Sequence, residues 1–556
     1  MAERAGRRPL RVFAFDPMVD RFRAPVLLQV PFEHLRPGLE GRLVRVVDVD
    51  LDRGRTLPVV DLDDPQVLLG SGLTPSESDF RSHQQGVYAI AMVVLEAFER
   101  GLGRPLVWHA GRPLTLVPHA SEMQNAYIDP ETFSLLFGRF PATRSAGANL
   151  PGQTVYTCLG WDIVAHETCH PVMIDLRPME VGPDQEQPAS PDTFALHEGL
   201  SDLIACLVRL AEPEIVRPYI AEHGIDLSKT PLLTIGSQFG QAAGLGRVLR
   251  SFPGPGERPK SEEPHERGQS LTSAVVVAVL STQAEQCRDL FGLHGAPRAD
   301  GRWHPDLVGR LVEAVTTISR EALDVSIGAL DLLPPFDARF GDYLRAMVTV
   351  STERFGARHE AFRGHLITAF HERGMVPSDV DSLAPDAVAL VPFERSISTP
   401  LPCVDRALLL TQHAIELRRA FMTEPGSIDK AAEVVRTAVD ERARCERAIE
   451  SFVRKQRGAL GVPDGDLIRV RNLTGSFTTD TATGVRARVL VQVEHRPRGR
   501  RRTGEPSRRK GFTLIANSTG EIRYVVPTSA ARRSRQPKRW PWRNATNGNP
   551  LGQAAS

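Results

Sequence analysis

Cysteine is scarce in this chain of 556 residues, and no two cysteines have the C-x-x-C spacing of a metal-binding or redox motif. The six cysteines occupy positions 158, 169, 206, 287, 403 and 445. Their density is far below that of a small scaffold held together by disulfides. Cys158, Cys169 and Cys206 fall in apolar segments with a helical pattern, so we expect small buried thiols there rather than catalytic ones.

Long hydrophobic runs are also missing. No stretch reaches the roughly 18 consecutive apolar residues of a membrane-spanning helix. The charged N-terminal segment MAERAGRRPLRVFAFDP has no apolar core of a secretion signal behind it. The sequence therefore predicts a cytoplasmic protein that makes no use of a membrane.

Neither charge sign is in excess, because 68 Lys+Arg stand against 67 Asp+Glu for a net charge of +1. This balance argues against nucleic acid as the main partner of the chain. Two local segments are basic, 496–510 and 532–543. We interpret both as solvated loops, with an acidic partner as the alternative. Nothing in the sequence indicates an oligomeric state.

The length predicts two to four structural units, since a domain usually holds about 100–200 residues. Short apolar runs between Pro and Gly turns predict strands over residues 10–70. A long amphipathic helix is expected to begin at His83, followed by strands and loops over 104–150. Helical patterns dominate from Gln153 to about Gly374, interrupted by polar loops at 176–192 and 253–269.

The C-terminal part reads differently. Residues 375–400 form a connection rich in Pro, Asp and Ser, and two helices are expected at 404–423 and 427–457. A small β unit follows, with strands predicted within 487–495 and 511–526. The tail from Ser529 is basic and poor in apolar residues, which is typical of a disordered segment.

The strongest chemical signal is the HExxH motif His166-Glu167-Thr168-Cys169-His170. Residues four apart share one face of a helix, so both imidazoles can reach one metal ion. Glu167 follows the first ligand directly and can accept a proton from a water molecule at that ion. The alternative is a helical face that happens to carry two histidines in a chain with 16 of them.

A second segment supplies the ligand that HExxH lacks. Ser190-Pro191 is typical of a helix start. The helix that follows carries an apolar stripe with helical spacing, formed by Leu200, Leu203, Ile204 and Leu207. Glu198 and Asp202 share another face. A catalytic zinc takes three protein ligands, so Glu198 can be the third, while Asp202 can accept the outer N–H of a ligating histidine. The alternative is a pair of solvated acids.

Together, DIVAHETCH at 162–170 and HEGLSDL at 197–203 resemble the thermolysin-like gluzincin family of metallopeptidases, whose pattern is HExxH, a loop and ExxxD. Asn125-Ala126-Tyr127 resembles the family's strand that pairs with the substrate backbone. The segment 264–268, leading into a helix, resembles the one that delivers a transition-state histidine. His83 fits the family's long N-terminal helix.

The resemblance covers roughly residues 75–375 and is also seen to uncharacterised bacterial proteins that carry this core without a secretion signal. It implies an α+β fold of the two-lobed zincin type, with zinc between a β-rich and a helical lobe and with a C-terminal extension of helices and strands. The implied units are 1–75 (N-terminal β segment), 76–152 (N-terminal catalytic lobe), 153–375 (helical catalytic lobe), 400–528 (C-terminal helices and β unit) and 529–556 (disordered tail).

The resemblance also implies the roles of the site residues. It gives the zinc ligands as His166, His170 and Glu198, the general base and later proton donor as Glu167, and the residue that orients His166 as Asp202. His265 would stabilise the oxyanion, and Asn125 and Ala126 would bind the substrate. The implied activity is that of a zinc-dependent metalloendopeptidase, with a peptide or protein as substrate.

Three departures from the family pattern stand out. The family uses a tyrosine between the second histidine and the glutamate as an oxyanion donor, and here that loop has none. Pro171 follows the second ligand and is expected to end or kink the helix. The acids of the family's calcium sites are missing apart from Asp162, so calcium is not expected.

The departures leave two rival functions open. One is a catalytically impaired pseudo-peptidase that binds a peptide or protein. The other is an assembly protein whose C-terminal helices and β unit carry the function.

Overall fold

The computed structural model describes residues 6–21, 23–143, 148–177, 190–254, 256–294, 297–298, 301–394, 397, 399–423, 428–480, 484–497 and 510–528. Within them the chain has a mixed α+β fold, as the sequence predicts. The predicted loop at 176–192 and the basic segment at 496–510 lie largely outside these residues, and the tail at 529–556, with its basic segment, lies wholly outside. None of the described helices is long and apolar enough to cross a membrane.

The N-terminal part is built mainly of strands. A first antiparallel pair consists of β1 (Arg7–Val12) and β2 (Val26–Pro31). The main sheet has the order β3-β6-β8-β7, with β9 paired to β8. Its strands are β3 (Val44–Val46), β6 (Leu114–Glu122), β7 (Ala126–Asp129), β8 (Ser134–Pro141) and β9 (Thr154–Tyr156). A short pair, β4 (Val49–Asp50) and β5 (Arg55–Thr56), and helix α1 (Pro65–Leu69) complete this part. Because β3 pairs with β6, the predicted boundary at residue 75 runs through one sheet.

Helix α2 (Phe80–Leu102) contacts the strands β3 and β6 as well as the helices behind them. It begins three residues before His83, because the side chain of Asp79 caps it by accepting the backbone N–H of Arg81. It ends at Gly103, whose positive φ of 68° suits a residue without a side chain.

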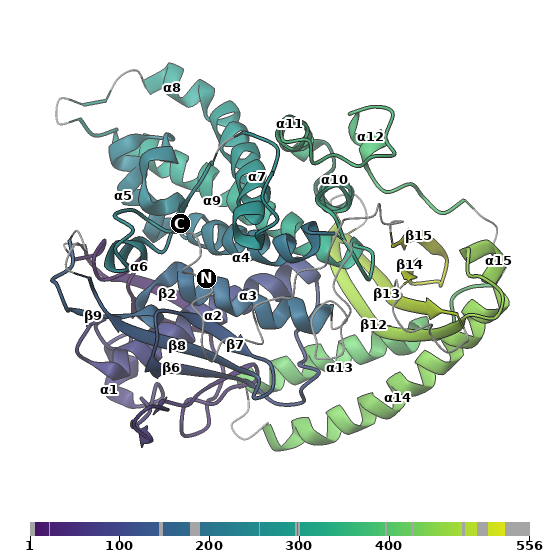
Figure 1. Ribbon diagram of the computed structural model, residues 1–556, viewed down its shortest axis with the longest axis horizontal. Coiled ribbons are helices and arrows are strands. Elements are labelled where there is room, and N and C mark those ends of the chain that lie inside the picture. The colour runs from purple at the N-terminus through teal and green to yellow at the C-terminus, as the bar shows by residue number, and fades with distance from the viewer. Residues whose placement is uncertain are drawn as a thin grey trace.

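The middle of the chain is helical, with a two-stranded ribbon. Its elements are η2 (Thr157–Leu159), α3 (Trp161–Leu176), α4 (Asp192–Leu210), α5 (Pro213–His223), η3 (Leu227–Lys229), η4 (Pro231–Leu233), β10 (Thr234–Ile235), α6 (Ser237–Ala242), β11 (Arg250–Ser251), α7 (Pro264–Gln286), α8 (Arg288–His294), α9 (Pro305–Gly328), η5 (Ala329–Leu332), α10 (Phe340–Phe355), η6 (Gly356–His359) and α11 (Glu360–Glu372). Figure 1 shows α2, α3 and α4 between the main sheet and the helices α7 and α9.

Two sequence predictions about these helices need correction. Helix α3 does not end at Pro171 but continues to Leu176, because the buried side chains of Val172 and Met173 anchor its last turn in the core. Helix α7 begins at Pro264, so His265 lies in its first turn and not in a loop before it. Proline at the first helical position and a capping glutamate before it explain this early start.

The described residues of the C-terminal part form four helices and a second sheet. The helices are α12 (Pro385–Val388), α13 (Val404–Thr423), α14 (Ile428–Lys455) and α15 (Arg457–Leu460). The strands β12 (Leu467–Asp480), β13 (Gly484–Arg496), β14 (Lys510–Asn517) and β15 (Ile522–Pro527) form an antiparallel meander. The helix predicted at 404–423 is confirmed, and so are the strands predicted after residue 487. The sequence did not indicate β12, since several of its inward side chains, such as Ser476 and Thr478, are polar.

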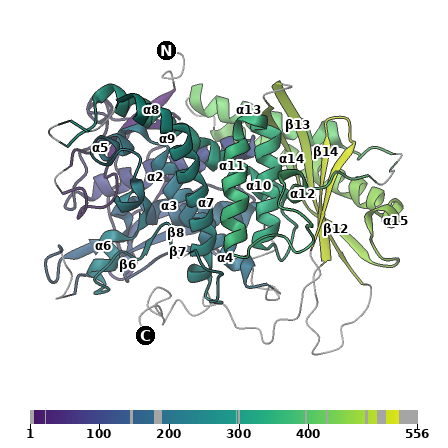
Figure 2. The same cartoon turned by 90° about the horizontal axis from the view of Figure 1, so that it is seen from above.

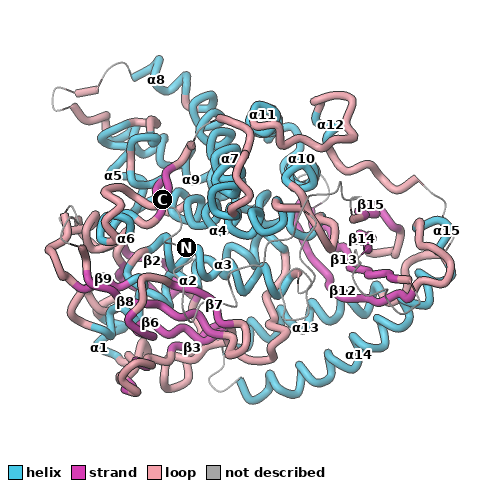
Figure 3. The backbone as a smooth tube through the Cα atoms, viewed as in Figure 1, coloured by secondary structure: helices cyan, strands magenta, loops and turns pink. Residues whose placement is uncertain are grey.

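The second sheet uses both of its faces. Val489, Val491 and Val493 face a core formed with α13 and α14, while Leu490 and Ile515 belong to the core of the main body. In Figure 3 the strands form two groups on opposite sides of the molecule, with helices between them. In Figure 2, α10 and α11 stand between α7 and this second sheet.

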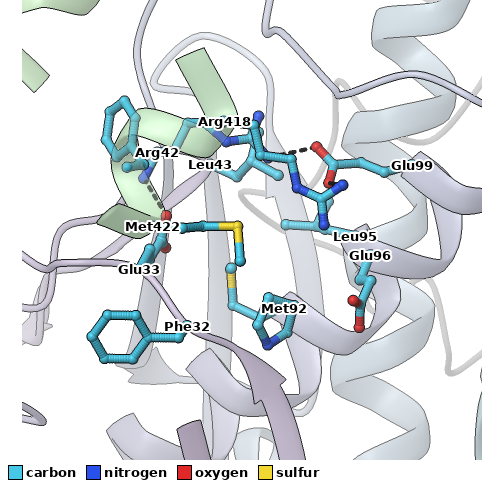
Figure 4. A pocket seen from close by; sticks show the side chains of 12 residues that line it. Phe32, Glu33, Arg42, Leu43, Met92, Leu95, Glu96, Glu99, Arg418 and Met422 are labelled. Carbon is cyan, nitrogen blue, oxygen red and sulfur yellow. Dashed lines mark hydrogen bonds and ion pairs between the residues drawn. The ribbon is translucent and has the colours of Figure 1, made fainter. Parts of the chain in front are cut away.

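Helix α13 also reaches the N-terminal part. Figure 4 shows a pocket at this junction, where Arg418 and Met422 of α13 lie near Met92 and Glu99 of α2. The Glu99 carboxylate pairs with Arg42 at 2.5 Å and with Arg418 at 3.3 Å. Residues 400–528 therefore have a core of their own and yet pack against the rest of the chain through α13 and the second sheet.

Candidate metal centre

The two motif segments lie on neighbouring helices that run antiparallel. His170 and Glu198 approach each other at one level, and His166 and Asp202 approach at the next. On each helix the two residues are four positions apart, which is about 6 Å along the helix axis. Because the spacing is the same on both antiparallel helices, the two histidines of α3 lie opposite the two acids of α4.

Three potential ligand atoms converge at this point. The Nε2 atoms of His166 and His170 are 3.2 Å apart, and Oε2 of Glu198 lies 3.2 Å from the first and 3.9 Å from the second. Zinc binds N and O ligands at about 2.0–2.1 Å in a tetrahedron, which separates the ligand atoms by about 3.3 Å. The three observed distances lie close to this value. Oε2 of Glu198 is also buried without a well-oriented hydrogen bond from the described residues, as a ligand atom awaiting a cation would be.

Asp202 fixes the orientation of His166. Its Oδ1 accepts a hydrogen bond from Nδ1 of His166 at 2.8 Å. This bond puts the ring proton on Nδ1 and leaves the lone pair of Nε2 facing the centre. Arg250 of β11 holds Asp202 in turn, with Nε 2.6 Å from Oδ2 and a terminal nitrogen 2.8 Å from Oδ1. Burial would raise the pKa of Asp202, but Arg250 and His166 hold it below its usual range.

Burial and neighbouring charges together set the protonation of the groups at this centre. Burial would raise the pKa of Glu198, but the neighbouring histidines hold it well below its usual value. Burial lowers the pKa of His166, but Asp202 and Glu198 raise it to about 9. Burial lowers the pKa of His170 to about 3, so this imidazole stays neutral. The carboxylates of Glu198 and Asp202 are therefore ionised on the two sides of the His166 ring, and His170 is neutral.

Glu167 lies beside the two histidines and is partly exposed. Its carboxylate oxygen is within 4.8 Å of the candidate ligand nitrogens of His166 and His170. Burial raises the pKa of Glu167 to about 7, with Glu198 adding to the effect and His166 opposing it. A carboxylate with a pKa near neutrality can both accept and donate a proton during one reaction cycle.

His265 approaches from the first turn of α7. Its Nε2 lies 3.1 Å from Oε2 of Glu198, and its Nδ1 lies 2.8 Å from Oε1 of Glu263. Burial lowers the pKa of His265, but Glu198 and Glu263 outweigh burial and raise it to about 10. His265 is therefore an imidazolium at neutral pH, held in place by the residue that caps its own helix.

A contact between two glycines brings α7 this close to α4. A Cβ atom on Gly199 would lie 2.6 Å from the carbonyl oxygen of Gly268, and one on Gly268 would lie 2.7 Å from the backbone nitrogen of Gly199. The hydroxyl of Thr272 also donates to the Gly199 carbonyl at 2.8 Å. Because Gly199 directly follows Glu198, this crossing sets the position of His265 relative to the ligand.

Strand β7 lies at the edge of the main sheet and contacts α3. Gly138 donates its N–H to the carbonyl of Asn125 at 3.0 Å, so these two residues form a hydrogen-bonded pair. In an antiparallel ladder the next residue points its peptide groups the other way. The N–H and C=O of Ala126 therefore face away from β8. No hydrogen bond or ion pair between described residues joins Asn125 or Ala126 to the metal centre.

The structure thus gathers six of the predicted site residues: His166, Glu167, His170, Glu198, Asp202 and His265. His83 lies elsewhere, beside His119 and Cys158. Asp162 accepts the backbone N–H groups of Ile163 and Gly236.

Sequence reasoning missed two residues of the centre. Nothing near Asp202 in the sequence signals Arg250, which comes from a distant strand. Glu263 could have been found, because an acid two residues before His265 also occupies a helix-capping position.

Comparisons with protein-family models, with curated proteins and with solved structures find no match for this chain.

Proposed function

We propose that the protein is a zinc-dependent metallopeptidase that hydrolyses peptide bonds with a water molecule. The observation that carries the proposal is the convergence of three ligand atoms, from His166, His170 and Glu198, at separations of 3.2–3.9 Å. Two histidines and one glutamate form a common ligand set of hydrolytic zinc sites, which keep one position open. A bound zinc ion there would act as a Lewis acid and lower the pKa of a water molecule.

Glu167 is the proton carrier in this proposal. Its carboxylate accepts the proton of the attacking water and then delivers it to the nitrogen of the leaving amine. The first step needs an ionised carboxylate and the second needs a protonated one. A pKa of about 7 makes both forms accessible at neutral pH.

His265 stabilises the negative charge that develops on the carbonyl oxygen of the peptide. Its ring is cationic, and Glu263 fixes its direction through Nδ1. Nε2 of His265, which lies 3.1 Å from Glu198, carries the N–H that would turn to the substrate oxygen. A preoriented cationic donor favours the charged transition state over the neutral substrate.

The edge strand β7 offers a place for the substrate backbone. An extended peptide can add to a free strand edge through its own N–H and C=O groups. The peptide groups of Ala126 face that edge, and Asn125 precedes it. In this arrangement the main sheet forms one lobe, the helices α3 to α11 form the other, and zinc lies between them as in two-lobed zincins.

The lack of a tyrosine between His170 and Glu198 favours one alternative function. A second oxyanion donor would then be missing, and the protein would be a pseudo-peptidase that binds a peptide or protein without cleaving it. Both functions keep the metal and the strand edge, so only a rate measurement separates them.

The test compares wild type with Glu167→Gln and Glu198→Ala, measuring bound zinc and cleavage of an unfolded protein in the same samples. Glu167→Gln is expected to keep its zinc and to lose about a hundredfold or more in rate. Glu198→Ala is expected to lose zinc affinity, because a ligand is gone. A wild type that binds zinc but cleaves nothing supports the pseudo-peptidase. A Glu167→Gln variant that cleaves as fast as wild type overturns the mechanism.

A further inference from the structure

A second cluster of potential metal ligands lies outside the centre described above. It consists of His83 near the start of α2, His119 on β6 and Cys158 in η2, and we call it the His83 cluster. The three side chains are buried, with exposed fractions of 0%, 3% and 1%. One ligand atom from each lies within 4.8 Å of the other two. The proposed peptidase chemistry uses none of them.

Hydrogen bonds on the outer side of each imidazole determine where its proton lies. Nε2 of His83 is 2.9 Å from the carbonyl oxygen of Ser76, which can only accept, so this nitrogen carries a hydrogen. Nδ1 of His119 is 2.9 Å from both carboxylate oxygens of Asp48, so it also carries a hydrogen. In the neutral rings, the lone pairs are therefore left on Nδ1 of His83 and Nε2 of His119.

These two nitrogens face each other at 2.8 Å. Two lone pairs at this distance repel each other unless a cation lies between them, either a shared proton or a metal ion. Sγ of Cys158 lies 4.0 Å from the same nitrogen of His83 and completes a set of three donors.

We propose that His83, His119 and Cys158 form a second metal site, which binds a divalent cation of the zinc type. Nitrogen and thiolate donors are the ligands that zinc prefers in structural sites. On binding, the metal displaces the proton of the thiol, which is released to solvent, and a metal–sulfur bond forms. The two histidine nitrogens need to separate from 2.8 Å to about 3.3 Å, which a small rotation of either ring achieves.

The charges of the site balance for a divalent ion. The thiolate of Cys158 and the carboxylate of Asp48 together supply two negative charges. Asp48 is fully buried, accepts a hydrogen bond from Gln84 at 2.6 Å and lies 2.9 Å from Nδ1 of His119. The Asp48–His119 contact has the same form as the Asp202–His166 contact at the first centre, where a carboxylate orients a ligating imidazole.

The location of the site indicates a structural role. The rings of Phe80 and Tyr156 pack against both histidines, with centroids 4.5–5.5 Å apart. Cys158 lies just before α3, the helix that carries the HExxH motif. A metal at this point would tie α2, β6 and the start of α3 together. Its loss is expected to lower the unfolding temperature and not to remove the catalytic ligands.

The experiment uses the full-length chain with the first centre disabled by His166→Ala and His170→Ala. After chelator treatment and cobalt loading, this variant is expected to bind about one Co²⁺ per chain and to show the near-ultraviolet charge-transfer absorption of a thiolate ligand. Only the His83 cluster contains a thiol among the two sets of ligands, so the first centre cannot produce this band. The band is expected to disappear on adding Cys158→Ser and to persist on adding Cys287→Ser, a control that changes another buried thiol.

A further variant keeps the proposal testable if Cys158→Ser does not fold. Asp48→Asn retains all three ligands but weakens the orientation of His119, so cobalt affinity is expected to fall about 10- to 100-fold while the band itself remains. Absence of the thiolate band from cobalt-loaded wild type overturns the proposal, and the two histidines then share a proton. A band that survives Cys158→Ser in a folded protein overturns it as well.

Discussion

The crossing of α4 and α7 at two glycines leads to a quantitative prediction for Gly199→Ala. The new Cβ atom would lie 2.6 Å from the carbonyl oxygen of Gly268 and 3.1 Å from its Cα. Ordinary contacts begin at 3.4 Å, so the two helices have to separate by about 0.8 Å (3.4 − 2.6). The three nearest opposing atoms are backbone, so no side chain can rotate away to relieve this contact.

The expected loss of stability follows from this overlap. Overpacking of a tight contact destabilises a protein by about 1–3 kcal/mol. Alanine also favours a helix over glycine by about 1 kcal/mol, which partly offsets the loss. Gly364→Ala provides the matched control, since Gly364 lies inside α11 and a Cβ there meets nothing within 4 Å. Gly199→Ala is therefore expected to be about 1–3 kcal/mol less stable than Gly364→Ala.

The same shift changes the candidate active site. His265 lies one turn before Gly268 on α7, so moving this helix displaces the imidazole from its place 3.1 Å from Glu198. A misplacement of about 1 Å can reduce a catalytic rate by roughly a hundredfold. We expect kcat to fall about 10- to 100-fold in Gly199→Ala and to stay unchanged in Gly364→Ala.

Denaturant unfolding and steady-state kinetics on a peptide substrate measure the two effects, with zinc kept saturating. Equal stability and equal kcat in the two alanine variants would show that the glycine crossing does not set the position of His265.

Three further outcomes are expected. Gly103→Ala should be less stable than Gly461→Ala by about 1–3 kcal/mol in denaturant unfolding. Both glycines have a positive φ, but only at Gly103 would the new Cβ lie 2.4 Å from a backbone oxygen of β12. Equal losses of stability would argue against the close contact between Gly103 and β12. Arg250→Met should weaken zinc binding about 10- to 100-fold in competition with a chelator, since it removes the hydrogen bond and the ion pair that hold Asp202; unchanged affinity would remove Arg250 from the site. Burial raises the pKa of Asp16 to about 7, so between about pH 4 and pH 7 the folded state holds a proton that the unfolded state releases. The free energy of unfolding therefore falls as the pH rises through this range. Asp16→Asn should make this fall less steep, and an unchanged slope would contradict the prediction.

The metal ligands could be predicted from the sequence because their spacing is a local property. His166 and His170 share a helical face, and so do Glu198 and Asp202, whatever the rest of the chain does. Arg250 could not be predicted in this way, since its contact with Asp202 depends on where a short strand lies in the tertiary structure. Cys158 was expected to be a buried thiol, which is confirmed, but the two imidazoles beside it come from separate elements.

Tertiary packing also explains where the predicted fold was incomplete. Pro171 is a helix breaker by local rules, yet α3 continues past it because the next two side chains are fully buried. Strand β12 was missed because several inward residues are polar, so the hydrophobic alternation that marks a strand is weak. The first turn of α7 was predicted to be a loop, because Pro264 at its start is surrounded by charged residues and no apolar helical pattern begins there.

The central claim is that zinc held by His166, His170 and Glu198 enables peptide hydrolysis, and a zinc back-titration tests it most directly. The protein is stripped with a chelator, zinc is added in steps, and cleavage of an unfolded protein is followed together with the amount of bound metal. Cleavage is expected to be absent from the stripped protein, to return as zinc binds, and to stay absent in His170→Ala at the same zinc concentrations. Cleavage that survives stripping, or that returns equally in His170→Ala, would contradict the claim.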